Sequence, residues 1–388
     1  MRILAAFDKY KDSMTADQAC SIAASCIRES MGSSVDLVEA PMTDGGEGFC
    51  PILTKAANGQ IKEHHVCGPL GRPVKAPIGW VSLNTVPPPT LNYFGNCRGN
   101  LAIIEMASAA GLEQVPESER DPHHTTSRGV GELIRIAADQ GAAAILLGIG
   151  GSATNDLGLG ALEAMGLSFS EANRIIPKKW ASVHQMTGFI DGKMPPVFIA
   201  CDVDNPLLGP RGATAVYGPQ KGLLSKHLNS FEREADRISA LLCRYFGHEL
   251  SLRDQPGCGA AGGIGFGLKA ACGAEFIPGF DLVKAWLNLE MQVAASDLIL
   301  TGEGSFDQSS LAGKGPYSLL ELAQKSGTKV LLLPGHLDAA TAARVRMRFP
   351  NVLLQGITPA DCPLQEALRK GPLNLKETLN RVLRETVL

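Results

Sequence analysis

Acidic residues and glycines occur together at four places in this sequence, each directly after a short apolar run. The four clusters are TDGGEG (43–48), GIGGSATNDLG (148–158), CDVDNPLLG (201–209) and TGEGSFD (301–307). At the carboxyl ends of parallel strands, glycine-rich turns direct backbone N–H groups at anions. Carboxylates at the same place would repel a phosphate unless a cation lay between them, and Mg²⁺ is usually held by one or two carboxylates together with phosphate oxygens. The clusters therefore predict a site for a magnesium-bound phosphate.

Two lysines beside these clusters are candidate phosphate partners. Lys11 lies in DKYKDS and Lys314 in AGKGP, and an ammonium group serves a phosphate as a point charge. A single DGG or GEG is more often an ordinary turn, and a single lysine is more often a solvated surface charge. The repetition at four predicted strand ends is what favours a functional site over unrelated turns.

Known nucleotide-binding motifs match this chain poorly. The P-loop pattern is absent, because Gly313-Lys314 is followed by glycine and is preceded, five residues earlier, by Gln308. GIGGSA (148–153) fits the dinucleotide pattern G-x-G-x-x-G/A after a strand. The polar residues TND follow it directly, however, and only Glu171 loosely meets the acid expected about twenty residues further on. An NAD-dependent oxidoreductase rests on this stretch alone and stays open as an alternative.

Alternating strand and helix patterns must position the clusters. The N-terminal part predicts strands over 2–7 and 35–39 and helices over 16–31 and 46–57, with a capping box at Thr15 and Gln18. The C-terminal part repeats this alternation, with strands over 297–304, 329–335 and 351–356, helices over 312–326 and 338–348, and a final helix. This order is typical of a parallel sheet covered by helices.

The middle of the chain has a different pattern. Short alternating runs with turn residues over 59–83 indicate antiparallel strands, and buried strands are predicted over 142–151 and 197–203. Helices are predicted over 126–141, 157–166 and 228–246. A chain of 388 residues also exceeds what one hydrophobic core usually serves. The predicted fold class is α/β with two domains: a parallel-sheet domain built from both chain ends (1–65 and 290–388) and an inserted mixed α/β domain (66–289).

Composition excludes several classes of function. The net charge is −3 and no Lys/Arg run occurs, so nucleic acid is not an expected partner. The start, MRILAAFDKYKD, lacks the long apolar stretch of a signal peptide, and no run of eighteen apolar residues occurs, so no membrane is expected. The ten cysteines contain no C-x-x-C pair and lie mostly in apolar settings, which favours reduced thiols and a cytoplasmic location.

At these motifs the sequence resembles the class I, bacterial-type glycerate kinase family (the glycerate 2-kinases). The matching stretches are DKYKDSMTA (8–16), PMTDGGEG (41–48), GPLGRPV (68–74), IEMASAAGL (104–112), TTSRGVGELI (125–134), GIGGSATND (148–156), CDVDNPLLGPRGA (201–213), GPQKG (218–222), PGCGAAGGIGFGL (256–268), TGEG (301–304) and LAGK (311–314). The resemblance implies ATP-dependent, Mg²⁺-assisted phosphorylation of D-glycerate. Members of this group mostly form 2-phosphoglycerate, which is therefore the expected product, whereas other glycerate kinases form 3-phosphoglycerate. It also implies that the larger domain is flavodoxin-like.

With this resemblance, each candidate residue receives a predicted role. The catalytic candidates are Asp202, Asp44 and Lys11, and the metal candidates are Asp44, Glu47, Asp202 and Glu303. The substrate-binding candidates are Arg72, Arg128, Ser152, Asp156 and Asn205. The nucleotide-binding candidates are Gly302, Glu303, Gly304, Asp307 and Lys314. Because these residues come from both predicted domains, we expect transfer in an interdomain cleft that closes on its substrates, in a monomer or homodimer.

The chain departs from the family pattern at two places. After TGEG the family usually has R-x-D-x-Q-T, whereas this chain has Ser305 and Ser309 at the arginine and glutamine positions. Lys9 and Tyr10 stand where the family often has Ser-Phe. Serine cannot hold a phosphate or carboxylate bidentately as arginine does, so another arginine supplies that charge or the affinity differs. A non-catalytic nucleotide-binding protein is therefore a second alternative.

Overall fold

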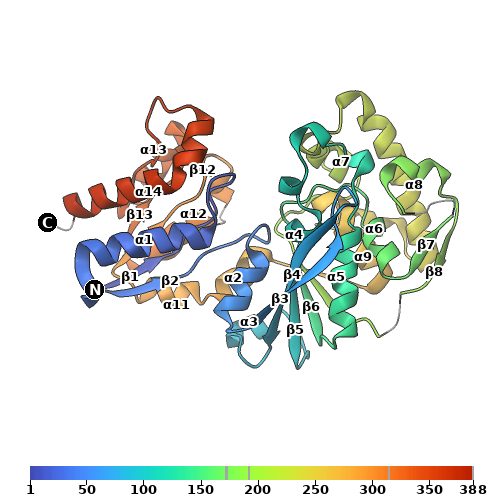
Figure 1. The fold of residues 1–388 in the computed structure, drawn as a ribbon, viewed down its shortest axis with the longest axis horizontal. Helices are drawn as coiled ribbons and strands as arrows, with labels where there is room; N and C mark the ends of the chain where they lie inside the picture. The colour runs from blue at the N-terminus through green and yellow to red at the C-terminus, as the bar shows by residue number, and fades with distance from the viewer. Residues whose placement is uncertain (171–173, 191–192, 313–314, 387–388) are drawn as a thin grey trace. The chain divides into compact units, whose positions relative to one another are not determined.

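The computed structural model describes residues 1–170, 174–190, 193–312 and 315–386 (Figure 1). Its contacts divide the chain into two compact units, which we call the terminal unit (Met1–Asp44 with Val283–Leu388) and the inserted unit (Gly45–Leu282). The first border lies well before the predicted one near residue 66. The reason is that α2 (Phe49–Ala56) packs on the sheet of the inserted unit, where the Cys50 amide donates to the Glu105 carboxylate at 3.1 Å. The next strand, β3 (Gln60–Cys67), then pairs along its whole length with β4 (Pro73–Ser82) of the same sheet.

The terminal unit is built on a five-stranded parallel sheet. Its strands are β1 (Arg2–Ala5), β2 (Asp36–Glu39), β11 (Leu298–Thr301), β13 (Lys329–Leu332) and β15 (Val352–Leu354). They lie in the order β15-β13-β11-β1-β2, and every neighbouring pair is parallel. Counted along the chain this is the order 2-1-3-4-5 of flavodoxin-like folds. The prediction of a flavodoxin-like parallel-sheet domain built from both chain ends is confirmed. The implied size order is wrong, because this domain is the smaller of the two units.

Helices cover both faces of this sheet. Alternate residues of β1 point to opposite faces and pack into two separate cores. Ile3 and Ala5 share a core with α1 (Ala16–Met31) and α14 (Leu364–Thr386). Leu4 belongs to the opposite core, with α11 (Leu289–Ala294), α12 (Gly315–Ser326) and α13 (Ala339–Arg348). This is the two-residue period of a strand buried on both sides. The capping box predicted for α1 is present at Thr15 and Gln18.

The inserted unit contains a six-stranded mixed sheet in the order β10-β9-β6-β5-β4-β3. Its further strands are β5 (Asn100–Glu105), β6 (Ala144–Gly148), β9 (Val197–Ala200) and β10 (Glu275–Ile277). β5, β6, β9 and β10 run parallel, whereas β4 is antiparallel to both of its neighbours, β3 and β5. The predicted mixed α/β character of this part is confirmed. Two small sheets add β7 (Leu167–Phe169) with β8 (Met186–Gly188), and β12 (Ser305–Phe306) with β14 (His336–Leu337) in the terminal unit.

The helices of the inserted unit follow the predicted alternation. The longer ones are α2 (Phe49–Ala56), α5 (Arg128–Asp139), α6 (Leu159–Ala164), α8 (Leu228–Phe246) and α9 (Ile264–Cys272). Short helices α3 (Pro88–Leu91), α4 (Met106–Ala110) and α7 (Ala213–Tyr217) lie between strands, and α10 (Gly279–Trp286) crosses the second border between the units. Of the helices described, none is long and apolar enough to cross a membrane.

Two of the glycine clusters pack directly against each other. The Gly150 amide donates to the Gly45 carbonyl at 2.9 Å. A Cβ at Gly150 would lie 2.6 Å from the Gly46 Cα, and a Cβ at Gly148 would lie 2.6 Å from the Gly45 carbonyl oxygen. These glycines therefore let the segments after β2 and β6 approach backbone to backbone.

Replacing Gly150 by alanine tests this packing. Gly150 has no left-handed φ, so only the missing space opposes a methyl group. We expect Gly150→Ala to reduce the free energy of unfolding by about 1–3 kcal/mol, as overpacked sites do, and thermal unfolding followed by circular dichroism would measure it. The matched control is Gly356→Ala, where a Cβ would have its nearest atom 3.9 Å away. Equal melting temperatures for the two variants would contradict the explanation.

Candidate functional site

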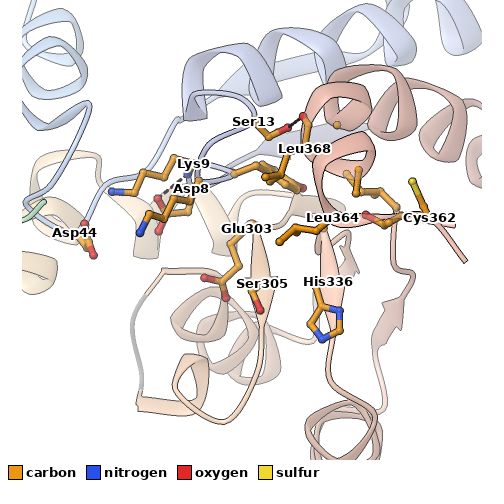
Figure 2. A pocket seen from close by; sticks show the side chains of 18 residues that line it. Asp8, Lys9, Ser13, Asp44, Glu303, Ser305, His336, Cys362, Leu364 and Leu368 are labelled. Atoms are coloured by element: carbon orange, nitrogen blue, oxygen red, sulfur yellow. Dashed lines mark hydrogen bonds between the residues drawn. The ribbon is translucent and has the colours of Figure 1, made fainter. Parts of the chain in front are cut away.

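A cavity of about 600 Å³ opens at the carboxyl ends of the terminal-unit strands (Figure 2). Segments that follow all five strands line it, together with the first turns of α14: residues 8–11 and 13, Asp44, 303–305, 335–336, 357–358 and selected residues of 362–371. The strand order reverses between β1 and β11, and ligands of open parallel sheets bind at such a reversal. The volume also lies in the range of small-molecule sites. We call it the switch-point cavity.

One end of the switch-point cavity is charged. Asp8, Lys9, Lys11 and Asp44 line it, and Figure 2 shows Asp8 and Lys9 beside each other with Asp44 near them. The Lys9 amide donates to the Asp8 carboxylate at 2.7 Å. Positive and negative side chains thus share one end of the cavity, as a site for an anion with its counter-cation requires.

Glu303 lies at the middle of the cavity in an unfavourable state for a carboxylate. Its Oε1 atom is buried and has no hydrogen-bond partner among the described residues. Burial raises the pKa of Glu303 to about 8, against the effect of a hydrogen bond from the Ser310 side chain, and the negative charges of Asp8, Asp307 and Asp44 raise it further. At neutral pH the side chain therefore holds a proton unless a cation takes its place.

Tyr10 joins three of the loops that form the cavity. Its hydroxyl donates to the Leu333 carbonyl, 2.5 Å away. A Cβ at Gly302 would lie 2.3 Å from the Tyr10 hydroxyl oxygen and 2.4 Å from the Leu333 carbonyl oxygen. Gly302, a nucleotide-binding candidate, therefore also has a packing role: it lets the loops after β1, β11 and β13 meet. A phenylalanine at position 10 would lack this hydrogen bond.

The other end of the cavity is apolar and is formed by the start of α14. Leu364, Ala367 and Leu368 line it. Pro372 lies inside α14 and has no N–H to donate to the Leu368 carbonyl one turn earlier. The Ser13 hydroxyl donates to that carbonyl instead, at 2.6 Å. A Cβ at Gly371 would lie 2.0 Å from the Ser13 hydroxyl oxygen, so the glycine leaves room for this bond.

The TGEGSFD cluster forms a turn organised by Asp307. The Asp307 carboxylate accepts from the Ser309 amide at 2.9 Å, the Ser309 hydroxyl at 2.6 Å and the Ser305 hydroxyl at 3.1 Å. The Ser309 bonds hold the pKa of Asp307 below its usual range. Asp307 is thus occupied by the turn itself, whereas Glu303 and Gly304 line the cavity. Lys314 lies outside the described residues.

In the inserted unit, a buried lysine, Lys221, holds the loop after β6. Lys221 donates from Nζ to the Ser152 hydroxyl oxygen at 2.8 Å and to the Thr154 carbonyl at 2.6 Å. Burial lowers the pKa of Lys221 to about 7, and the charge of Asp156 opposes this. Thr154 Oγ1 and both side-chain polar atoms of Asn155 are buried without a hydrogen-bond partner among the described residues.

Asp156 itself holds the starts of two helices. It accepts from the Ser127 amide and hydroxyl, each at 2.8 Å, and from the Gly158 and Gly160 amides, each at 3.2 Å. These bonds use the amides at the start of α6 that a dinucleotide pyrophosphate would need. The GIGGSA stretch therefore lacks the anion-binding helix start of a dinucleotide site.

The other predicted residues of the inserted unit also have protein partners. Arg128 pairs with Glu132 at 3.0 Å and Glu163 at 2.6 Å, and Arg72 pairs with Glu119 at 2.8 Å. The Asn205 side-chain amide donates to the Arg211 carbonyl, and the Asp202 carboxylate accepts from the Phe280 backbone amide at the start of α10. Glu47 packs close to Gly151, where a Cβ would lie 2.1 Å from Glu47 Oε1.

Comparison with known proteins covers the whole chain. The glycerate kinase family matches residues 3–387. The chain is similar to the glycerate kinase of Bacillus subtilis (strain 168), with 35% identity over 97% of this chain and 96% of the relative. It is similar to the glycerate 2-kinase of Escherichia coli (strain K12), with 36% identity over 87% and 86%. The chain belongs to the glycerate kinase family.

A solved structure supports this family membership at the level of the fold. The crystal structure of a protein assigned as glycerate kinase 2 from Salmonella typhimurium LT2 is similar to the chain with a TM-score of 0.74 and 35% identity, over 99% of this chain and 98% of that chain. The resemblance inferred from the motifs is confirmed, and so is the prediction of an enzyme of the glycerate kinase family.

Of the predicted metal candidates of this family member, Asp44 and Glu303 line one cavity, whereas Glu47 and Asp202 belong to the inserted unit. No three His, Cys, Asp or Glu side chains in the described part of the chain come together as a metal site. The buried, partnerless Oε1 of Glu303 and the nearby Asp44 carboxylate nevertheless suit Mg²⁺, which takes oxygen ligands and commonly only one or two carboxylates.

Asp8, Lys9 and Lys221 were missed as individual candidates. Asp8 lies three residues after the end of β1, at the reversal of strand order. This position can be recognised only once the strand order is known. Lys221 lies in the family stretch GPQKG, but its burial has no signature in the sequence.

Glu303→Gln tests the electrostatic state of the cavity. The folded-state pKa of about 8 exceeds the usual 4.5, so the folded chain binds a proton that the unfolded chain releases. The free energy of unfolding should therefore fall as the pH rises from about 5 to about 8. Because glutamine removes this loss, we expect the melting temperature of the variant in metal-free buffer to exceed that of the wild type by a margin that grows over this range.

Asp307→Asn is the matched control for that experiment. Its pKa is lowered, so its stabilising contribution is present above the usual pKa of 3.8 and is lost as the pH falls through the folded-state value. We expect this variant to melt lower than the wild type at neutral pH. A Glu303→Gln margin that does not change with pH would contradict the assigned cause.

A double-mutant cycle tests how α14 is attached. Ser13→Ala leaves the Leu368 carbonyl without its donor, and we expect a loss of about 1 kcal/mol in the free energy of unfolding. Pro372→Ala supplies an N–H one turn after Leu368, so the same Ser13→Ala change should cost clearly less in that background. Urea unfolding of the four proteins measures the coupling. Strictly additive effects on the free energy of unfolding would show that the stabilisation by the Ser13 hydrogen bond does not depend on Pro372.

Proposed function

We propose that the protein is an ATP-dependent kinase that phosphorylates D-glycerate with the help of Mg²⁺, forming 2-phosphoglycerate rather than 3-phosphoglycerate. The observation that carries the proposal is the switch-point cavity, in which two lysines and several carboxylates meet at the strand-order reversal of a flavodoxin-like sheet. Membership of the glycerate kinase family supports the reaction class.

The charged end of the cavity suits the nucleotide phosphates. Phosphoryl transfer demands positioning and charge neutralisation more than covalent chemistry. Lys9 and Lys11 bring positive charge to phosphate oxygens, and Asp44 and Glu303 would hold Mg²⁺. When bound, the ion would neutralise charge on the phosphates. It would also favour the ionised form of Glu303, whose pKa is otherwise raised.

The loop after β6 suits a small polar substrate such as glycerate. The Ser152 hydroxyl oxygen accepts from Lys221, so the Ser152 O–H group can still serve as a donor to an anion. The partnerless buried atoms of Thr154 and Asn155 add further polar groups to the same loop. We assign glycerate binding to this loop, and Asp202 remains our candidate acceptor for the proton of the attacking hydroxyl.

The two alternative functions receive less support. An NAD-dependent oxidoreductase would need free amides at the start of α6, and Asp156 accepts from those at Gly158 and Gly160. A non-catalytic nucleotide-binding protein was suggested by Ser305 and Ser309. Both serines bond to Asp307 in a closed turn, and lysines at the charged end of the cavity supply positive charge without the missing arginine.

A coupled ADP-release assay with purified protein, MgATP and D-glycerate tests the proposal, with ³¹P NMR of the product. We expect turnover that requires all three components and a single product resonance, that of 2-phosphoglycerate. Turnover with 3-phosphoglycerate as the product would overturn the assigned hydroxyl but not the kinase. Saturable ATP binding without ADP release would favour the binding-protein alternative.

A further inference from the structure

The switch-point cavity has two chemically different ends. Figure 2 shows Asp44 and Lys9 at one end and Cys362 at the other, with Glu303 and Ser305 between them. Side chains at the second end are mainly apolar, among them Leu364, whose surface is 72% exposed. Covering such an exposed apolar side chain with an apolar group of a ligand removes its surface from water and so favours binding.

The size of the cavity and its apolar wall exceed what glycerate or a phosphate group needs. Neither ligand carries a flat apolar surface, and both are much smaller than a cavity of about 600 Å³. A purine nucleotide has both parts in one molecule: an aromatic base for the apolar wall and phosphates for the lysines. Ser305 and His336 lie between the ends, where polar side chains suit ribose hydroxyls.

The apolar wall is also joined to the loop that carries the lysines. Ser13, in the loop after β1, donates to the Leu368 carbonyl that Pro372 leaves free. A base packed against α14 would therefore lie on a helix that is hydrogen-bonded to the loop that holds Lys9 and Lys11. This is the arrangement expected of one continuous nucleotide site.

We propose that the first two turns of α14, with Leu364, Ala367 and Leu368, form the binding site for the purine base of the nucleotide, opposite the lysine-bearing phosphate end. The assignment rests on the proposed function, since it takes the phosphoryl donor to be a nucleotide. It adds the part of the chain that recognises the base, which none of the glycine-acid motifs contains.

Cys362 offers a direct test because it is a free, partly exposed thiol at this end of the cavity. The full-length protein is alkylated with limiting iodoacetamide, and the rate at each cysteine is followed by mass spectrometry. With adenosine or ADP at ten times its dissociation constant, we expect alkylation of Cys362 to slow about tenfold. Inorganic triphosphate and D-glycerate should not slow it. Cys97, a partly exposed thiol of the inserted unit, is the internal reference.

The outcomes separate the base site from the kinase. Protection of Cys362 by adenosine supports the base site even if the ADP-release assay shows no turnover. Turnover with calorimetric binding of ADP, but no protection by either adenosine or ADP, would place the base elsewhere and overturn the assignment while leaving the kinase intact. Protection by triphosphate alone would show that phosphates occupy this end and would also overturn it.

A pair of variants on α14 gives an independent readout. Leu364→Asp puts a charge where the base would pack, and its exposure makes misfolding unexpected. We expect its KM for ATP to rise about tenfold, the equivalent of about 1.4 kcal/mol, with the KM for glycerate unchanged. Leu373→Asp is the matched control, since Leu373 is 51% exposed on the same helix but does not line the cavity. Equal KM values for ATP in the two variants would contradict the proposal.

Discussion

The reversal of strand order between β1 and β11 is the constraint on which the candidate site depends. Connections on the two sides of the reversal leave the sheet in opposite directions, so the loops at that point diverge and a cavity opens between them. Tyr10 then sets the distance between these loops by bonding to the Leu333 carbonyl over Gly302. The cavity is thus a consequence of topology, and a small number of contacts give it its detailed shape.

Charge at this cavity is balanced only in part by the protein itself. Several carboxylates surround Glu303, and its burial raises its pKa to about 8. A group in that state stabilises the folded chain less as the pH rises, and a cation reverses this cost. In the proposed function, the same carboxylates that make the ligand-free protein less stable would hold a phosphate-bound Mg²⁺. Such a conflict between stability and function is common at active sites.

Glycines and acids of the four motifs divide between packing and ligand-facing positions. Gly148 and Gly150 allow close backbone approach, and Asp156 and Asp307 satisfy amides and hydroxyls of their own loops. Asp44 and Glu303, by contrast, line the cavity. A carboxylate that caps a helix and one that faces a ligand cannot be told apart in the sequence, because both come shortly after a strand. Only their partners in space distinguish them.

The sequence by itself determined the α/β class, the flavodoxin-like parallel sheet and membership of the glycerate kinase family. Periodicity, capping residues and long ordered motifs are local properties, and they are readable without coordinates. Tertiary structure decided the rest: the early border at Asp44, the burial of Lys221, and the wall that α14 adds to the cavity through Ser13 and the Leu368 carbonyl. These features join residues up to several hundred positions apart, and the free energy of such contacts depends on packing and desolvation that no local pattern contains.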